Sequence, residues 1–305
     1  MGAKLVRATI LAAVTGLSLP ALALGLLVSP VQLGLVGKPG ESVSGVVQVS
    51  ASNAVDTSIT VSFGDFTKNE EGQLVEVAPG SQPRSCLNWL SASQLTFTAP
   101  AQGRASIQIS AQIPKDASGS YWAFAAFSAP PPPRTGEGTG LLFMPRVIIP
   151  VIVSVEGTLA PKIAIEATKA SYDAAKGGVE AKALIRNTGN AAVLVNGAFA
   201  LEQQGSASSG ATEVAEKEVG PLTSLPGTTL AAKELLPWSG PWQGLQVHSY
   251  LRYGPEPEEA AESVTSIAGL PSGAASGRLA PQAPQPPAGA PPSKPAPASQ
   301  DGKRP

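Results

Sequence analysis

Residues 107–113 read Ile-Gln-Ile-Ser-Ala-Gln-Ile, with an apolar side chain at nearly every second position. Successive side chains of a β-strand point to opposite faces, so this run predicts a strand with one face in a core and one in water. The alternation recurs at Ile59–Phe63 and between Leu245 and Leu251. Turn signals such as Lys38-Pro39-Gly40 and Leu225-Pro226-Gly227 separate these runs, and no stretch has a long helical period. The sequence therefore predicts β-sandwiches.

A second decisive run, Arg146–Val155, is expected to be the last strand of a first sandwich. Its odd-numbered side chains from Val147 to Val155 are all aliphatic and fall on one face. Pro150 lies within it, and proline inside a strand is typical of a sheet edge.

The pattern of runs and turns predicts two sandwich domains in tandem. The first is expected over residues 24–157 and the second over residues 158–255. Residues 256–305 are predicted to be an acidic linker and a disordered Pro/Ala-rich tail, with an extra short strand or helix around 263–270 as an alternative. The tail could simply be solvated, or it could cross a wall layer or bind a partner.

The composition agrees with an all-β protein and excludes some functions. The chain has 305 residues, enough for about two domains, with 32 Gly, 30 Pro and only 14% charged residues. The net charge of −1 does not indicate binding to nucleic acid, which requires an excess of positive charge. Cys86 is the single cysteine, so no intramolecular disulfide can form, and we expect a buried apolar residue there rather than a reactive thiol.

The N-terminus predicts export. Lys4 and Arg7 precede an apolar run over residues 8–24, and Ala21 and Ala23 supply the small residues of a cleavage site. We expect a signal peptide over residues 1–23 and a mature chain that lies outside the cytoplasm, periplasmic or at the cell surface, without a membrane span. An uncleaved membrane anchor is the alternative.

One region carries a more specific pattern, whose parts are Pro39-Gly40-Glu41, Trp89, and Pro114, Asp116, Gly119 and Tyr121 of the segment Ile113–Phe124. With these motifs, residues 28–157 resemble the N-terminal domain of periplasmic pilus-assembly chaperones. They also resemble domains of bacterial cell-surface proteins of the WxL-interacting kind. The N-T-G-N sequence at Asn187–Asn190 is similar to a turn of bacterial immunoglobulin-like domains, and we interpret it as structural.

The resemblance implies two immunoglobulin-like domains in a boomerang arrangement and a partner-binding edge strand. In these chaperones the last strand of the first domain completes a pilin subunit by strand addition. The residues implied here are Arg146, Val147, Ile149, Val151 and Val153. The chaperones hold the subunit's carboxylate with an arginine in the first strand and a lysine in the last. Residues 27–36 contain neither, and the last strand offers only Arg146.

Little in the sequence points to catalysis. The single histidine, His248, falls on the polar face of its strand, and one His with one Cys does not make a structural zinc site. Asp65, Glu70 and Glu71 cluster near a turn and are interpreted as solvated. A loop reading Pro-Trp-Ser-Gly-Pro-Trp holds Trp238 and Trp242, which could contact a sugar or a protein partner, or close the end of the sandwich.

Two functions remain. The first is an exported, non-catalytic, chaperone-like protein that binds a cell-surface or pilus-type subunit through the edge strand. The second is a structural cell-envelope protein or adhesin that binds peptidoglycan or another surface polymer. Neither requires a cofactor, and we do not expect an enzyme.

Overall fold

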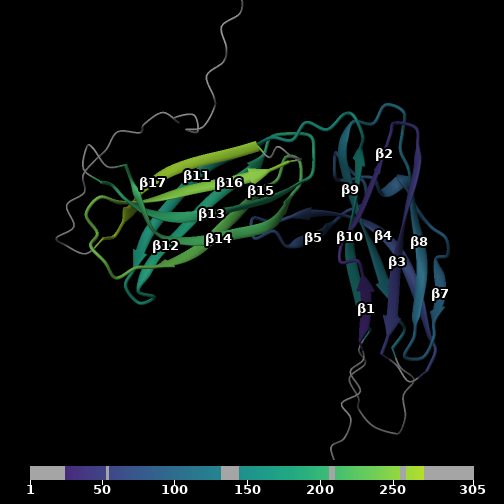
Figure 1. The fold of residues 1–305 in the computed structure, drawn as a ribbon. Helices are drawn as coiled ribbons and strands as arrows, with labels where there is room; N and C mark the ends of the chain where they lie inside the picture. Colours follow the sequence, from purple (N-terminus) through teal and green to yellow (C-terminus); the bar gives the residue numbers. More distant parts are fainter. Residues whose placement is uncertain (1–24, 53–54, 132–143, 206–209, 255–258, 271–305) are drawn as a thin grey trace, which may run out of the picture.

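The computed structural model describes residues 25–52, 55–131, 144–205, 210–254 and 259–270, which form two β-sandwiches (Figure 1). Those residues contain strands and one short 3₁₀ helix, η1 (Leu87–Trp89), and no α-helix. Within the described ranges no helix has the length and apolar character to cross a membrane. The all-β prediction is confirmed. The expected signal peptide and the tail beyond residue 270 lie outside the described residues.

The first sandwich packs two sheets face to face. One has the order β1-β3-β8-β6, and the other has the order β2-β10-β9-β4-β5, with β7 beside the start of β4. The strands are β1 (Leu26–Ser29), β2 (Leu33–Gly37), β3 (Ser42–Ala51), β4 (Thr57–Lys68), β5 (Leu74–Val77), β6 (Leu90–Ala92), β7 (Thr96–Ala99), β8 (Arg104–Gln112), β9 (Gly119–Ser128) and β10 (Arg146–Val155).

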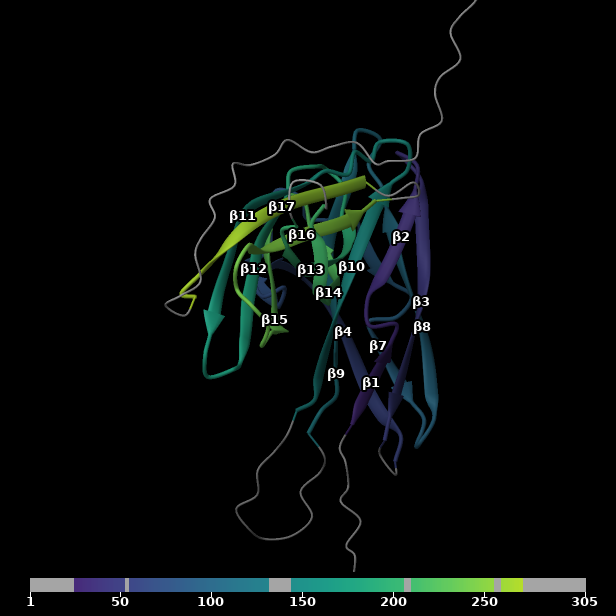
Figure 2. The same cartoon turned by 60° about the vertical axis from the view of Figure 1, so that its left-hand side comes forward.

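The first strand divides between the two sheets. Sequence analysis treated residues 27–36 as one strand, whereas β1 pairs antiparallel with β3 and β2 pairs parallel with β10. Pro30 lies at the break, and it has no N–H with which to continue a ladder. Figure 2 shows β1 and β2 following each other along one side of the sandwich.

Alternating apolar residues build the core of the first sandwich, as predicted. Ile59, Ile107 and Ile109 are at most 2% exposed, and Cys86 is fully buried beside them. Burial raises the pKa of the Cys86 thiol, which fits the predicted role as a small apolar residue.

Asp65 does not belong to a solvated acidic cluster. It lies within β4 and is fully buried, whereas Glu70 and Glu71 are exposed. The chain after β5 folds back over β4 and supplies donors: Ser85 Oγ donates to Oδ1 and the Gly80 N–H donates to Oδ2, both at 2.6 Å. These hydrogen bonds compensate for the burial of the carboxylate.

The second sandwich is a single sheet of the order β14-β13-β16-β17-β11-β12-β15 that folds over to enclose its own core. A short parallel pairing of β11 with β17, at Ala170 and Ser171, joins its two halves. The strands are β11 (Ile163–Asp173), β12 (Gly178–Asn187), β13 (Val193–Gln203), β14 (Thr212–Ser224), β15 (Thr229–Pro237), β16 (Leu245–Tyr253) and β17 (Glu259–Ala268).

Strand β17 corrects the expected end of this domain. The sequence placed an acidic linker from residue 256, but residues 259–268 pair with β16 and extend the second sandwich. The residues that face inward at Ala261, Ser263 and Thr265 are small or polar, so only Ile267 gives a hydrophobic signal. The alternative of an extra element near 263–270 was closer to the structure.

The two sandwiches meet in a joint with an apolar centre. Leu225 of the second sandwich is fully buried in a cluster with Phe66, Trp122 and Phe124 of the first. The Trp122 Nε1–H donates to the carbonyl of Phe66 at 2.9 Å, so the polar group of the indole has a hydrogen-bond partner although the ring is buried.

Polar contacts surround this centre. The Asn190 carbonyl accepts from the Ser120 N–H at 2.8 Å, and the Asn190 side chain donates to the Thr158 carbonyl at 2.9 Å. On the other side Lys68 Nζ donates to the Thr223 carbonyl at 3.0 Å, and burial lowers the pKa of Lys68. The joint therefore holds the bent arrangement of the two bodies in Figure 1 by apolar packing and by hydrogen bonds.

Candidate partner-binding edge

Strand β10 is paired along its whole length on one side and over half of its length on the other. It runs antiparallel to β9 from Arg146 to Val155, whereas β2 pairs only with Val151–Val155. No described strand pairs with Arg146–Pro150 on the side away from β9. We call these five residues the open half of β10.

The neighbouring hydrogen bonds show which backbone groups point outward. The Glu156 N–H donates to Gly37 on the β2 side, and the Pro145 carbonyl accepts from Ala129 on the β9 side. Because strand backbones alternate, even-numbered residues of β10 direct N–H and C=O away from β9. The backbone N–H and C=O of Arg146 and Ile148 therefore point to the open side, whereas the Pro150 carbonyl meets Leu33 where the pairing with β2 begins. Pro150 has no N–H, but an N–H at this position would point away from β9, so no hydrogen bond to β9 is lost. This is where prolines are tolerated in edge strands.

Most of the side chains that the sequence proposed for partner binding lie in the core of the first sandwich. Ile149 is 2% exposed and Val151 and Val153 are fully buried, and all three belong to the core with half-buried Val147 packed against it. Val151 and Val153 are also covered by β2. A strand of a closed sandwich must supply core residues as well as an edge, and the sequence pattern does not separate these roles.

Arg146 is already engaged within the chain. Its guanidinium makes a two-pronged contact with Glu76 of β5, with Nη2 donating to Oε2 at 3.1 Å, and it lies 5.5 Å from the centre of the Phe124 ring. The hydrogen bonds with Arg146 lower the pKa of Glu76, and those with Glu76 raise the pKa of Arg146. Sequence analysis identified Arg146 but missed Glu76, because 70 residues separate the two.

The open half of β10 differs from the long edge of the second sandwich. The edge strand β14 carries charged residues and a proline, the usual protection against pairing with another chain. They are Glu213, Glu216, Lys217, Glu218 and Pro221. After Arg146, the open half of β10 has only aliphatic side chains and Pro150.

The tryptophan loop closes the end of the second sandwich. Trp238 and Trp242 are half-buried against its core, Trp242 meets Tyr172 edge-on at 4.6 Å, and Trp238 Nε1 donates to the Pro241 carbonyl. The packing agrees with the core-closing alternative.

His248 lies on the outward face of β16, as predicted, but it has partners. Its Nδ1 is 2.8 Å from Glu202 Oε1, and its Nε2 is 3.5 Å from Glu262. The Tyr250 hydroxyl donates to Glu216, a hydrogen bond that raises the pKa of Tyr250 to about 12. In the described part of the chain the polar partners of the His248 ring are these two carboxylates, with no hydrogen bond to a serine, threonine or cysteine, and no cluster of metal-ligating side chains occurs there. The arrangement is an ordinary polar surface.

Comparisons with known proteins give similarity in solved structures alone. No family model matches the chain, and no curated protein matches it. The class 5 fimbriae chaperone CfaA is 14% identical over 79% of this chain and 99% of its own, with a TM-score of 0.43. Fimbrial chaperones are thus among the similar structures, as the sequence resemblance implied.

Two further structures cover a similar share of the chain at lower identity and TM-score. A chain of the Salmonella enterica SafA pilin–SafB chaperone complex is 10% identical over 79% of this chain and 96% of its own, with a TM-score of 0.39. The E. coli chaperone DraB is 10% identical over 79% and 98%, with a TM-score of 0.38. No function follows from similarity at these levels.

Proposed function

We propose that this protein is an extracytoplasmic, non-catalytic binding protein that holds an extended segment of a partner by strand addition at Arg146–Pro150. The supporting observation is the half-paired β10: no described strand pairs with its first five residues on the side away from β9. The resemblance of residues 28–157 suggests the class of partner, a cell-surface or pilus-type protein subunit.

The backbone of the open half can supply only part of the binding free energy. Arg146 and Ile148 each offer an N–H and a C=O, whereas the Pro150 carbonyl already meets the Leu33 N–H in the parallel ladder with β2. At a net ~1 kcal/mol per hydrogen bond, four bonds give about 4 kcal/mol. Association itself costs at least about 4 kcal/mol, so these bonds alone give little affinity. The partner must therefore make side-chain contacts too.

The side chains beside the open half suit an apolar partner strand. In strand addition alternate residues of the bound segment point to opposite faces. One set would lie next to half-buried Val147 on the core side, and the other next to half-buried Ile148. Arg146 is paired with Glu76, so the proposed attachment does not depend on a charged anchor.

The substitution Ile148→Pro tests the proposal with little effect on the fold. It removes an outward N–H and leaves the β9 hydrogen bonds intact, as Pro150 already does two residues later. Ile148→Val is the matched control, because it keeps the N–H and a similar side chain. Substituting lysine at Ile149 or Val151 would place a charge in the core and so would not test binding.

The full-length tagged chain is expressed in its own host, captured from the extracytoplasmic fraction, and its co-purifying proteins are quantified. We expect a specific extracytoplasmic protein with wild type and with Ile148→Val. Recovery should fall at least about tenfold with folded Ile148→Pro, the loss expected from about 1.4 kcal/mol. Equal recovery with Ile148→Pro would contradict strand addition at this edge. Binding to purified peptidoglycan that survives Ile148→Pro would instead support the envelope role.

A further inference from the structure

The outer face of the four-stranded sheet of the first sandwich has almost no charge. We call it the serine face. Its outward side chains are Leu27 and Ser29 of β1, Ser42, Ser44, Val46, Gln48 and Ser50 of β3, and Arg104, Ser106, Gln108, Ser110 and Gln112 of β8. Arg104 is the only charged residue among them. It forms no ion pair with any carboxylate in the described part of the chain.

Arg104 lies in a row of three different side chains that crosses the sheet. The register pairs Arg104 of β8 with Ser50 of β3, and Ser50 with Leu27 of β1. A cation, a hydroxyl and an apolar group are therefore direct neighbours on one face. Leu27 is 69% exposed, so its side chain is free to contact a ligand.

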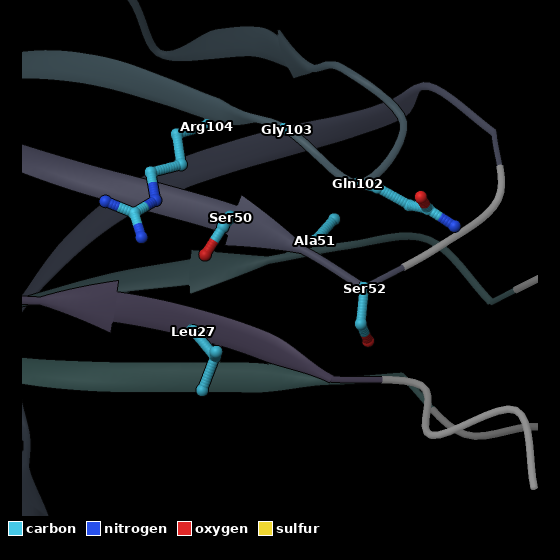
Figure 3. Close-up of a pocket in the computed structure, with 7 residues that line it drawn as sticks. All are labelled: Leu27, Ser50, Ala51, Ser52, Gln102, Gly103 and Arg104. Atoms are coloured by element: carbon cyan, nitrogen blue, oxygen red, sulfur yellow. The ribbon is translucent and has the colours of Figure 1, made fainter.

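This row forms one side of a hollow of about 400 Å³, which Ala51, Ser52, Gln102 and Gly103 complete. Figure 3 shows Arg104 and Ser50 on neighbouring strands, Leu27 on the strand on the far side of Ser50, and Gln102 on the turn. The volume lies at the lower end of the range for small-molecule sites.

The turn that closes the hollow holds an unusual backbone conformation. Gln102, with φ of 52°, is the only non-glycine residue of the described chain with a positive φ. Glycine or asparagine would adopt this region at lower cost. Asp56, which contacts the same turn, accepts the Ala101 N–H at 2.9 Å and so contributes to fixing the turn beside Arg104. Strained positions of this kind cluster at binding sites.

We propose that this hollow binds a carboxylate carried by a small apolar group. The guanidinium of Arg104 holds the carboxylate through two parallel N–H donors, and the Ser50 hydroxyl donates a third hydrogen bond. Leu27 contacts the apolar part. A phosphate dianion suits the hollow less well, because one cation would face two charges and the exposed leucine would have no partner. Such carboxylates occur in free acids and at peptide C-termini.

The test uses the full-length protein, ¹⁵N-labelled, with N-acetyl-leucine as the probe and amide chemical-shift changes as the readout. We expect saturable shifts centred on Leu27, Ser50 and Gly103. N-acetyl-leucinamide, which lacks the carboxylate, should bind at least about tenfold more weakly, since a charge-assisted contact is lost. Inorganic phosphate at the same ionic strength should also bind more weakly.

Two arginine variants locate the binding. Arg104→Gln should weaken N-acetyl-leucine binding about tenfold or more, while Arg252→Gln, which removes an exposed strand arginine from the second sandwich, should leave it unchanged. A peptide ending in free leucine that binds more tightly than N-acetyl-leucine would identify a peptide C-terminus as the source. Shifts that persist in Arg104→Gln, equal binding of phosphate, or no saturable shifts at all would each overturn the proposal.

Discussion

The orientation of the β10 backbone predicts that proline destabilises the fold much more at one position than at the next. Val147 directs its N–H toward β9, and Ile148 directs its N–H toward the open side. Both side chains are aliphatic and half-buried, so Val147→Pro and Ile148→Pro differ mainly in the hydrogen bond that is removed.

The expected difference follows from the cost of one lost ladder bond. Val147→Pro leaves the facing carbonyl of Phe127 without its donor, at a cost of about 1–3 kcal/mol, with distortion of the strand in addition. Ile148→Pro loses no described bond. It gives up part of a half-buried side chain, worth about 1 kcal/mol. We expect Val147→Pro to be less stable than Ile148→Pro by roughly 2 kcal/mol.

Urea denaturation of the two variants and wild type, followed by tryptophan fluorescence and circular dichroism, measures this difference. The first sandwich should unfold at a clearly lower urea concentration in Val147→Pro than in Ile148→Pro. Equal destabilisation, or a larger loss for Ile148→Pro, would refute the assignment of the open edge to even-numbered residues.

Three further outcomes follow from the structure. Hydrogen bonding with Arg146 lowers the pKa of Glu76 below its usual 4.5. The ion pair therefore stabilises the fold at pH values above 4.5, and this stabilisation is lost as the pH falls through the lowered pKa of Glu76. Glu76→Gln should therefore lower the free energy of unfolding by less than about 1 kcal/mol at neutral pH and leave it unchanged in acid. Urea denaturation at both pH values measures this. Gly119→Ala places a Cβ 2.4 Å from the Asn190 carbonyl at a φ of +79°, and should cost roughly 2 kcal/mol in thermal unfolding. Trp242→Ala should destabilise the second sandwich by about 2 kcal/mol in the same assay without changing partner recovery.

Alternation in the sequence was sufficient to find four of the strands that supply the cores, β4, β8, β10 and β16. The run Arg146–Val155 begins and ends as a strand where the pattern predicted, and its odd-numbered aliphatic residues lie inward. Cys86 is buried, as expected for a lone cysteine in an apolar neighbourhood. These features depend on local periodicity, which one sequence displays directly.

The remaining features depend on pairings between distant segments. Nothing near Val151 in the sequence indicates that β2 covers it, and nothing near Arg146 indicates Glu76. The pairing of β17 with β16 depends on small inward residues that resemble a linker. The hollow at Arg104 also appears only when three strands are placed in register, because Leu27, Ser50 and Arg104 are at least 23 residues apart in the sequence.

Amide hydrogen exchange at Ile148, with and without the captured partner, tests the proposed edge most directly. In the free protein we expect the Ile148 amide to exchange far faster than those of Val147 and Ile149, which bond to β9. Partner binding should slow the Ile148 amide at least about 100-fold, since it then donates to the added strand. A protected Ile148 amide in the free protein, or an unchanged rate in the complex, would contradict strand addition at β10.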